Sequence, residues 1–146
     1  MTSLLDRVDK EGGTINVALY ELNDPKGLEK RLQAKDHGNP KSRTVILGNE
    51  QVAATDTNPA NEDADSDNRK DLKAAGVLVI DRILGKGSIP HNKFMVLSQN
   101  GKPTAVLSGS TNWTSTGLCT QTKQCAGCRI RGAGAALHGL LERAQG

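Results

Sequence analysis

Four polar side chains in the second half of the chain have the types and spacing needed to handle a phosphate ester. His91 and Lys93 are two residues apart in an apolar segment that predicts a β-strand, so we expect both on one face of it. A turn at Asn100–Gly101 and a second apolar segment follow, and a polar loop with Ser110 and Asn112 comes next. If the segments pair as a hairpin, an imidazole, an ammonium, a hydroxyl and a carboxamide meet at one end. Such a set can attack and hold a phosphate ester without a metal ion.

Each of these residues also has an ordinary structural interpretation. A histidine and a lysine on an edge strand are commonly just solvated, and this is the alternative for His91 and Lys93. Asn112 has the alternative of capping a helix, which is compatible with anion binding because helix N-termini bind anions. Trp113 and the apolar residues opposite His91 are expected in the core.

The distribution of charge around the segment favours an anionic ligand. The net charge is only +3, from 19 basic and 16 acidic residues. Residues 82–122 contain no aspartate or glutamate, whereas residues 62–67 are acidic. The carboxylate-free stretch would not repel a phosphate, although a chance feature of composition is the alternative. Its basic residues are Arg82, Lys86, Lys93 and Lys102.

Length and composition indicate one domain with an aliphatic core. The chain has 146 residues and one each of tryptophan, tyrosine and phenylalanine. No apolar run is long enough for a transmembrane span. The acidic N-terminal segment does not resemble a signal peptide, so a cytoplasmic location is the default expectation.

The three cysteines allow a metal-binding alternative near the C-terminus. Cys125 and Cys128 form a C-x-x-C pair, and Cys119 and His138 would complete four zinc ligands. Free cysteines in a reducing compartment are the competing interpretation. We favour the latter, and expect no metal and no cofactor.

Apolar periodicity predicts alternating strands and helices before the hairpin. Helices are expected at residues 1–10, from Asn23-Asp24-Pro25 to about Lys35, and at 68–75, and strands at 14–22, 44–47 and 77–80. This order predicts an α/β fold with a mostly parallel or mixed sheet flanked by helices, in which the hairpin carries the site. Residues 50–67 read as a long loop. A further helix is expected after Trp113 with Leu118 facing inward, and no strand is expected in residues 123–146.

The motif His91-x-Lys93 followed by Gly109-Ser110-x-Asn112 resembles the signature of the phospholipase D superfamily. The flanking segments HNKFMVL, GSTNWTSTGL and ALYELNDP resemble bacterial members. The resemblance covers residues 14–122, so we divide the chain into a phospholipase D-like domain at 1–122 and an atypical tail at 123–146.

The resemblance implies a mechanism for the site residues. His91 would attack phosphorus to give a phosphohistidine. Lys93 and Asn112 would hold the nonbridging oxygens, and Ser110 would add a hydrogen bond. A second His-x-Lys copy supplies the general acid that protonates the leaving oxygen. The chain has one copy, so the resemblance implies a homodimer or a missing second half.

Two further departures from the family pattern bear on activity. The aspartate of the family motif falls at Ser98, which removes its electrostatic and hydrogen-bonding support. Lys123-Gln124 stand where the family has residues that orient the nucleophilic histidine. We hypothesise that the tail is read from a shifted frame, which the coding DNA would test.

Two functions follow as expectations. The first is a metal-independent phosphodiesterase that acts on a phospholipid or a nucleic acid. The second is a truncated, catalytically impaired half-domain that only binds phosphate.

Overall fold

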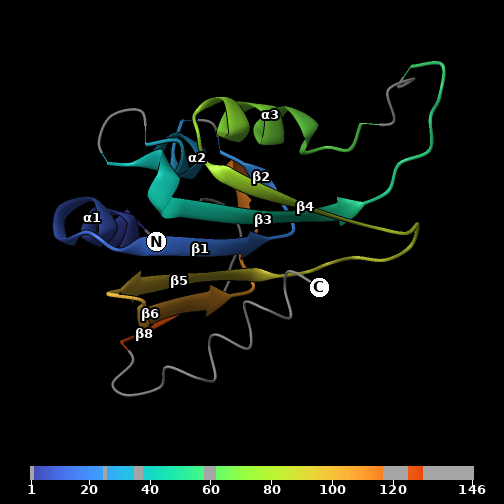
Figure 1. Cartoon of the computed structure of the whole chain (residues 1–146). Coiled ribbons are helices and arrows are strands. Elements are labelled where there is room, and N and C mark those ends of the chain that lie inside the picture. The colour runs from blue at the N-terminus through green and yellow to red at the C-terminus, as the bar shows by residue number, and fades with distance from the viewer. Residues whose placement is uncertain (1, 25, 35–37, 58–61, 117–124, 130–146) are drawn as a thin grey trace.

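The computed structural model describes residues 2–24, 26–34, 38–57, 62–116 and 125–129, which form a mixed β-sheet with helices against it (Figure 1). The helices are α1 (Thr2–Glu11), α2 (Leu28–Leu32) and α3 (Ser66–Ala74), with a short 3-10 helix η1 (Pro40–Ser42). The main strands are β1 (Thr14–Leu19), β3 (Arg43–Glu50), β4 (Leu78–Leu84), β5 (Lys93–Gln99), β6 (Lys102–Gly109) and β8 (Cys125–Arg129). Two short strands, β2 (Leu22–Asn23) and β7 (Trp113–Thr114), pair apart from this sheet.

The strand order in the sheet is β4-β3-β1-β5-β6-β8. Strands β1, β3 and β4 are parallel, and the pairs β1–β5, β5–β6 and β6–β8 are antiparallel. The predicted α/β class, with a mixed sheet and a hairpin, is therefore confirmed. In Figure 1 the arrowheads of β1 and β3 lie at the end of the sheet where β5 begins. The carboxyl ends of β1, β3, β4 and β6 and the amino end of β5 thus share one end of the sheet.

The main core lies between one face of the sheet and the three helices. Leu5 of α1, Leu32 of α2 and Leu72 of α3 are fully buried in one apolar cluster with alternate residues of the strands. Each such leucine contributes on the order of 1.5–3 kcal/mol of burial free energy. Trp113 belongs to the same cluster, as predicted, and the rest of the cluster is aliphatic.

The hairpin of β5 and β6 has the turn that the sequence predicts. Asn100 and Gly101 have φ angles of 51° and 72°, the left-handed values that a tight two-residue hairpin turn requires. The register pairs Phe94 with Ser108 and shifts between Leu97 and Ser98. The hairpin therefore places the amino end of β5 beside the carboxyl end of β6.

Two predicted strands differ from the observed ones near the site. The predicted strand at 14–22 is interrupted after Leu19, and Tyr20–Glu21 form a link to β2. His91 was expected within a strand, but β5 begins only at Lys93. The backbone N–H of His91 donates to Ile89 O at 2.8 Å, which is a local turn. Pro90 favours this turn because it cannot donate to a strand neighbour.

The expectation of a tail without a strand is wrong, because β8 pairs with β6. Ala105 lies opposite Arg129 at one end of this pairing, and Gly109 lies opposite Cys125 at the other. An unpaired β6 would leave a row of backbone N–H and C=O groups open, and pairing through the backbone needs no apolar pattern. The predicted helix position Leu118 and the rest of the tail lie outside the described residues, as do the zinc-ligand candidates Cys119 and His138.

Candidate active site

The expected site residues lie at the shared end of the sheet. Lys93 opens β5 opposite Leu19 of β1, and Gly109 closes β6. The loop that carries Ser110 and Asn112 follows directly. Pairing of Leu22 with Trp113, between β2 and β7, holds the end of this loop against the segment after β1.

Tyr20 is the common neighbour of His91 and Lys93. Its ring centroid lies 5.3 Å from that of His91, with the planes tilted by 54°. The ammonium of Lys93 lies 5.4 Å from the centre of the same phenol ring, within range of a cation–π interaction. His91 is exposed, whereas Lys93 is only 5% exposed. The imidazole of His91 is thus accessible to a substrate, whereas the ammonium of Lys93 is largely shielded from water.

Glu21 is the neighbour of Asn112. The Nδ2 group of Asn112 donates a hydrogen bond to Oε2 of Glu21, and the backbone N–H of Trp113 donates to Glu21 O at 3.3 Å. The Oδ1 atom of Asn112 is buried without a hydrogen-bond partner among the described residues. Glu21, from the first half of the chain, therefore brings a carboxylate to the end of the carboxylate-free stretch at 82–122.

The dipeptide Tyr20–Glu21 links the two halves of the motif. Tyr20 contacts His91 and Lys93, and the next residue holds Asn112. Ser110 is exposed in the connecting loop. Sequence analysis missed both members of the dipeptide, although two polar side chains directly after a buried apolar strand were a signal that could have found them.

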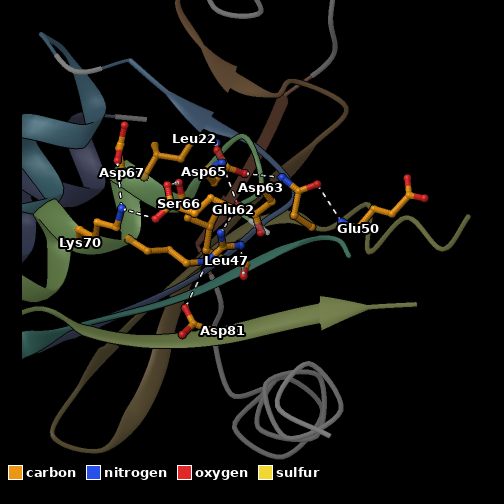
Figure 2. Close-up of polar contacts among 12 residues, drawn as sticks. Leu22, Leu47, Glu50, Glu62, Asp63, Asp65, Ser66, Asp67, Lys70 and Asp81 are labelled. Carbon is orange, nitrogen blue, oxygen red and sulfur yellow. Dashed lines mark hydrogen bonds and ion pairs between the residues drawn. The ribbon is translucent and has the colours of Figure 1, made fainter. Parts of the chain in front are cut away.

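A buried carboxylate holds the segment that directly follows the Tyr20–Glu21 dipeptide. Asp65 accepts hydrogen bonds from Leu22 N at 3.2 Å and from Asn49 Nδ2 at 3.0 Å (Figure 2). Asn49 in turn accepts from Glu50 N at 2.8 Å. Burial raises the pKa of Asp65 to about 6, partly offset by these donors and by Arg69. The hydrogen bonds of Asp65 fix the carboxyl end of β3 to the start of β2.

Ser98, at the position of the family aspartate, is remote from the candidate site. It lies five residues along β5 from Lys93, which corresponds to about 17 Å of extended strand. It pairs with Thr14 and Pro103 at the opposite end of the sheet. The missing carboxylate therefore removes no direct contact with His91.

The described residues add two findings about metals and membranes. No group of three or more histidine, cysteine, aspartate or glutamate side chains among them is arranged to hold a metal ion. No helix in the part of the chain that the structure describes is long and apolar enough to cross a membrane.

Comparison with solved structures identifies the fold: the chain has the fold of the phospholipase D superfamily. One match is Nuc from Salmonella typhimurium, a phospholipase D family member, with a TM-score of 0.64 and 16% identity over 99% of this chain and 83% of Nuc. NucT from Helicobacter pylori gives a TM-score of 0.57 and 9% identity over 98% and 85% of the two chains.

A third similar structure belongs to a much longer protein. Polyphosphate kinase from Porphyromonas gingivalis matches with a TM-score of 0.57 and 14% identity over 97% of this chain and 23% of the kinase. No family model matches the sequence, and no curated protein matches it. The fold is thus established by structure, and the motif residues carry the functional argument.

Proposed function

We propose that this chain is a metal-independent phosphodiesterase of the phospholipase D type. The observation that carries the proposal is the convergence on Tyr20–Glu21: His91 and Lys93 contact the first residue and Asn112 the second. An exposed nucleophile, a buried cation and a fixed amide donor at one sheet end are the parts that attack on a phosphodiester needs. The similar fold of phospholipase D family member Nuc supports the same assignment.

In the proposed reaction the imidazole of His91 attacks phosphorus and forms an N–P bond as the bond to the leaving oxygen breaks. Lys93 stabilises the negative charge on the nonbridging oxygens, and Asn112 and Ser110 donate hydrogen bonds to them. A proton from a second histidine goes to the leaving oxygen, and that histidine then takes a proton from the water that hydrolyses the phosphohistidine.

The second histidine is proposed to come from another copy of this chain, across a two-fold axis. The sequence contains one His-x-Lys, at His91 and Lys93. Neither His37 nor His138 has a lysine two residues later. A two-fold arrangement would bring two identical sites together, as isologous dimers do. A second half missing from this chain is the competing source.

A direct test measures hydrolysis of bis(p-nitrophenyl) phosphate in EDTA by wild type, His91→Ala and the histidine control His37→Ala. The proposal expects activity in wild type and in the control, with loss of at least about a hundredfold in His91→Ala, because the contribution of the general acid alone is on that order. Equal background hydrolysis in all three proteins would instead support the alternative, a catalytically impaired half-domain that only binds phosphate.

Subunit mixing tests the two-fold site. Wild type is refolded with an equal amount of His91→Ala. If two copies share one site, random pairing gives His91 in both copies of about a quarter of the dimers, so about a quarter of the activity remains. If each copy has an independent site, about half of the activity remains. Activity that follows the square of the wild-type fraction supports the shared site. Activity that follows the fraction itself contradicts it.

The nature of the phosphodiester is a separate proposal. In the described part of residues 82–116 no aspartate or glutamate occurs, and the basic residues there include Arg82, Lys86 and Lys102 beside Lys93. This slightly favours a nucleic acid over a phospholipid. Single-stranded DNA binding that weakens steeply with salt would support it, and salt-independent binding to phospholipid vesicles would favour the lipid.

A further inference from the structure

We propose that Glu21 is a positioning residue that fixes the orientation of the Asn112 carboxamide, so that an N–H rather than the oxygen faces the substrate phosphate. This inference rests on the proposed phosphodiesterase function and adds a residue to it. Glu21 lies 91 positions before Asn112 and is outside the His-x-Lys and Gly-Ser-x-Asn motifs.

The side chains of Glu21 and Asn112 differ in their hydrogen-bonding chemistry. A carboxamide can rotate by half a turn and exchange its NH₂ and oxygen with little change in shape. A carboxylate only accepts hydrogen bonds, so Glu21 can pair with Nδ2 of Asn112 but not with Oδ1. Of the two possible orientations, Glu21 therefore stabilises one.

That orientation leaves Asn112 with one more N–H to donate. One N–H is directed to Oε2 of Glu21, and Nδ2 has no second acceptor among the described residues. The opposite orientation would direct a carbonyl oxygen toward a phosphate oxygen, and two acceptors repel. Because Asn112 Oδ1 is buried and has no partner in the described part of the chain, little else there selects the orientation.

The backbone holds Glu21 in place for this role. Trp113 N donates to Glu21 O at 3.3 Å, and Leu22 N donates to the buried carboxylate of Asp65 at 3.2 Å. Trp113 itself is 1% exposed. The backbone around Glu21 is therefore held on two sides, by the loop that carries Asn112 and by the hydrogen bond from Leu22 to Asp65.

If Glu21 acts only through its charge, its loss should change phosphate binding and reaction rate in one direction. If Glu21 positions Asn112, the loss should change them in the opposite direction. A carboxylate near the site repels a phosphate, so removal of its charge alone should strengthen phosphate binding and speed the reaction. Glu21→Gln removes the charge but supplies a group that both donates and accepts. It can pair with Asn112 in either orientation, so positioning predicts a weaker and slower enzyme.

Glu50→Gln is the matched charge control. Glu50 ends β3; burial raises the pKa of Tyr20, and the charges of Glu21 and Glu50 raise it further. Its Oε1 accepts from Gly87 N at 2.6 Å, which a glutamine oxygen can also do. This variant removes a nearby negative charge without touching Asn112.

The experiment measures kcat/KM for bis(p-nitrophenyl) phosphate in Glu21→Gln, Glu21→Asp, Glu50→Gln, Asn112→Ala and Glu21→Gln/Asn112→Ala. We expect Glu21→Gln to lose about tenfold, Glu21→Asp to recover part of the loss, and Glu50→Gln to equal or exceed wild type, on the scale of one hydrogen bond to a charged group. The double variant should match Asn112→Ala alone, because Glu21 acts through Asn112. Faster turnover by Glu21→Gln, or losses that multiply in the double variant, would overturn the proposal.

A second measurement separates this inference from the proposed function. The side-chain amide of Asn112 is followed by ¹⁵N NMR with and without inorganic phosphate. In wild type we expect two well-separated N–H signals, one of them slow to exchange, and in Glu21→Gln their separation and protection should fall. If wild type lacks activity but its Asn112 amide signals differ from those of Glu21→Gln as expected, the catalytic proposal fails and the positioning role of Glu21 stands. Identical amide signals in both proteins reject the positioning whatever the activity.

Discussion

The phenol ring of Tyr20 lies 5.3 Å from the imidazole of His91, and both rings belong to segments that connect regular elements. His91 follows a local turn and is exposed, so this ring contact is a principal restraint on its side chain among the described residues. The hydroxyl of Tyr20 is not needed for it, because aromatic contacts depend on the ring.

Tyr20→Phe should therefore retain most of the phosphodiesterase activity, whereas Tyr20→Leu should lose about tenfold or more. The leucine removes both the ring contact to His91 and the cation–π contact to Lys93, which are each worth on the order of 1 kcal/mol. Steady-state kinetics of the two variants check this. A Tyr20→Phe loss as large as that of Tyr20→Leu would point to the hydroxyl instead.

Replacement of Lys93 by methionine should separate stability from activity. Lys93 is 5% exposed, on the helix-covered face with Met95 and Leu97, so an apolar side chain of similar length fits there. We expect the free energy of unfolding to be unchanged or higher, because a buried cation is costly to desolvate. Phosphodiesterase activity should fall by at least about a hundredfold, the scale of a lost electrostatic donor. Urea unfolding and kinetics on the same preparation test both halves, and a large loss of stability would contradict the first.

Gly48→Ala should disturb the site from a distance. A Cβ at Gly48 would lie 2.6 Å from Cγ and 3.0 Å from Cβ of Pro90, which is buried and precedes His91. The proline ring must shift, which should cost about 1–3 kcal/mol of stability and reduce activity. Gly85→Ala is the control, because a Cβ there meets nothing within 4 Å. Thermal unfolding and kinetics of the pair check it, and equal effects of the two substitutions would refute the packing argument.

Ser98→Asp, which places an aspartate where the phospholipase D signature has one, should leave kcat/KM within about threefold of wild type. The position is about 17 Å along β5 from Lys93, and a charge at that distance in water is strongly screened. Kinetics at low and high salt test this. A gain of tenfold or more would mean that the carboxylate acts on the site after all.

Asp65 should make the stability of the fold fall as pH rises from about 4 to 6. Burial raises its folded pKa from 3.8 to about 6, so the native state binds more protons than the unfolded state in this window. The associated loss is on the order of 2–3 kcal/mol once the group is ionised. Urea unfolding at several pH values should show this slope in wild type and a flatter one in Asp65→Asn. The same slope in both proteins would assign it to other groups.

The fold could be predicted from the sequence where local chemistry decides it. The Asn100–Gly101 turn defines a hairpin, and the apolar runs mark the buried strands, although their ends were misplaced by several residues. Strand β8 could not be predicted, because its place depends on the free backbone groups of β6 and not on its own apolar pattern.

The candidate site could be predicted only in part for a similar reason. His91, Lys93 and Asn112 lie in two motifs joined by the hairpin, so their approach to the Tyr20–Glu21 dipeptide follows in part from that hairpin. Tyr20 and Glu21 reach them through the register between β1 and β5, in which Leu19 faces Lys93. That pairing joins residues more than 70 positions apart, and no local pattern specifies it.

The tip of the hairpin provides a practical handle on this molecule. Asn100 and Gly101 are exposed, and the whole length of β5 separates them from Lys93. A fluorophore or a short peptide tag inserted there would project into solvent, away from the end of the sheet that carries the candidate site. The proposed binding of a phosphodiester and the proposed pairing of two copies could then be followed by fluorescence without altering the candidate site.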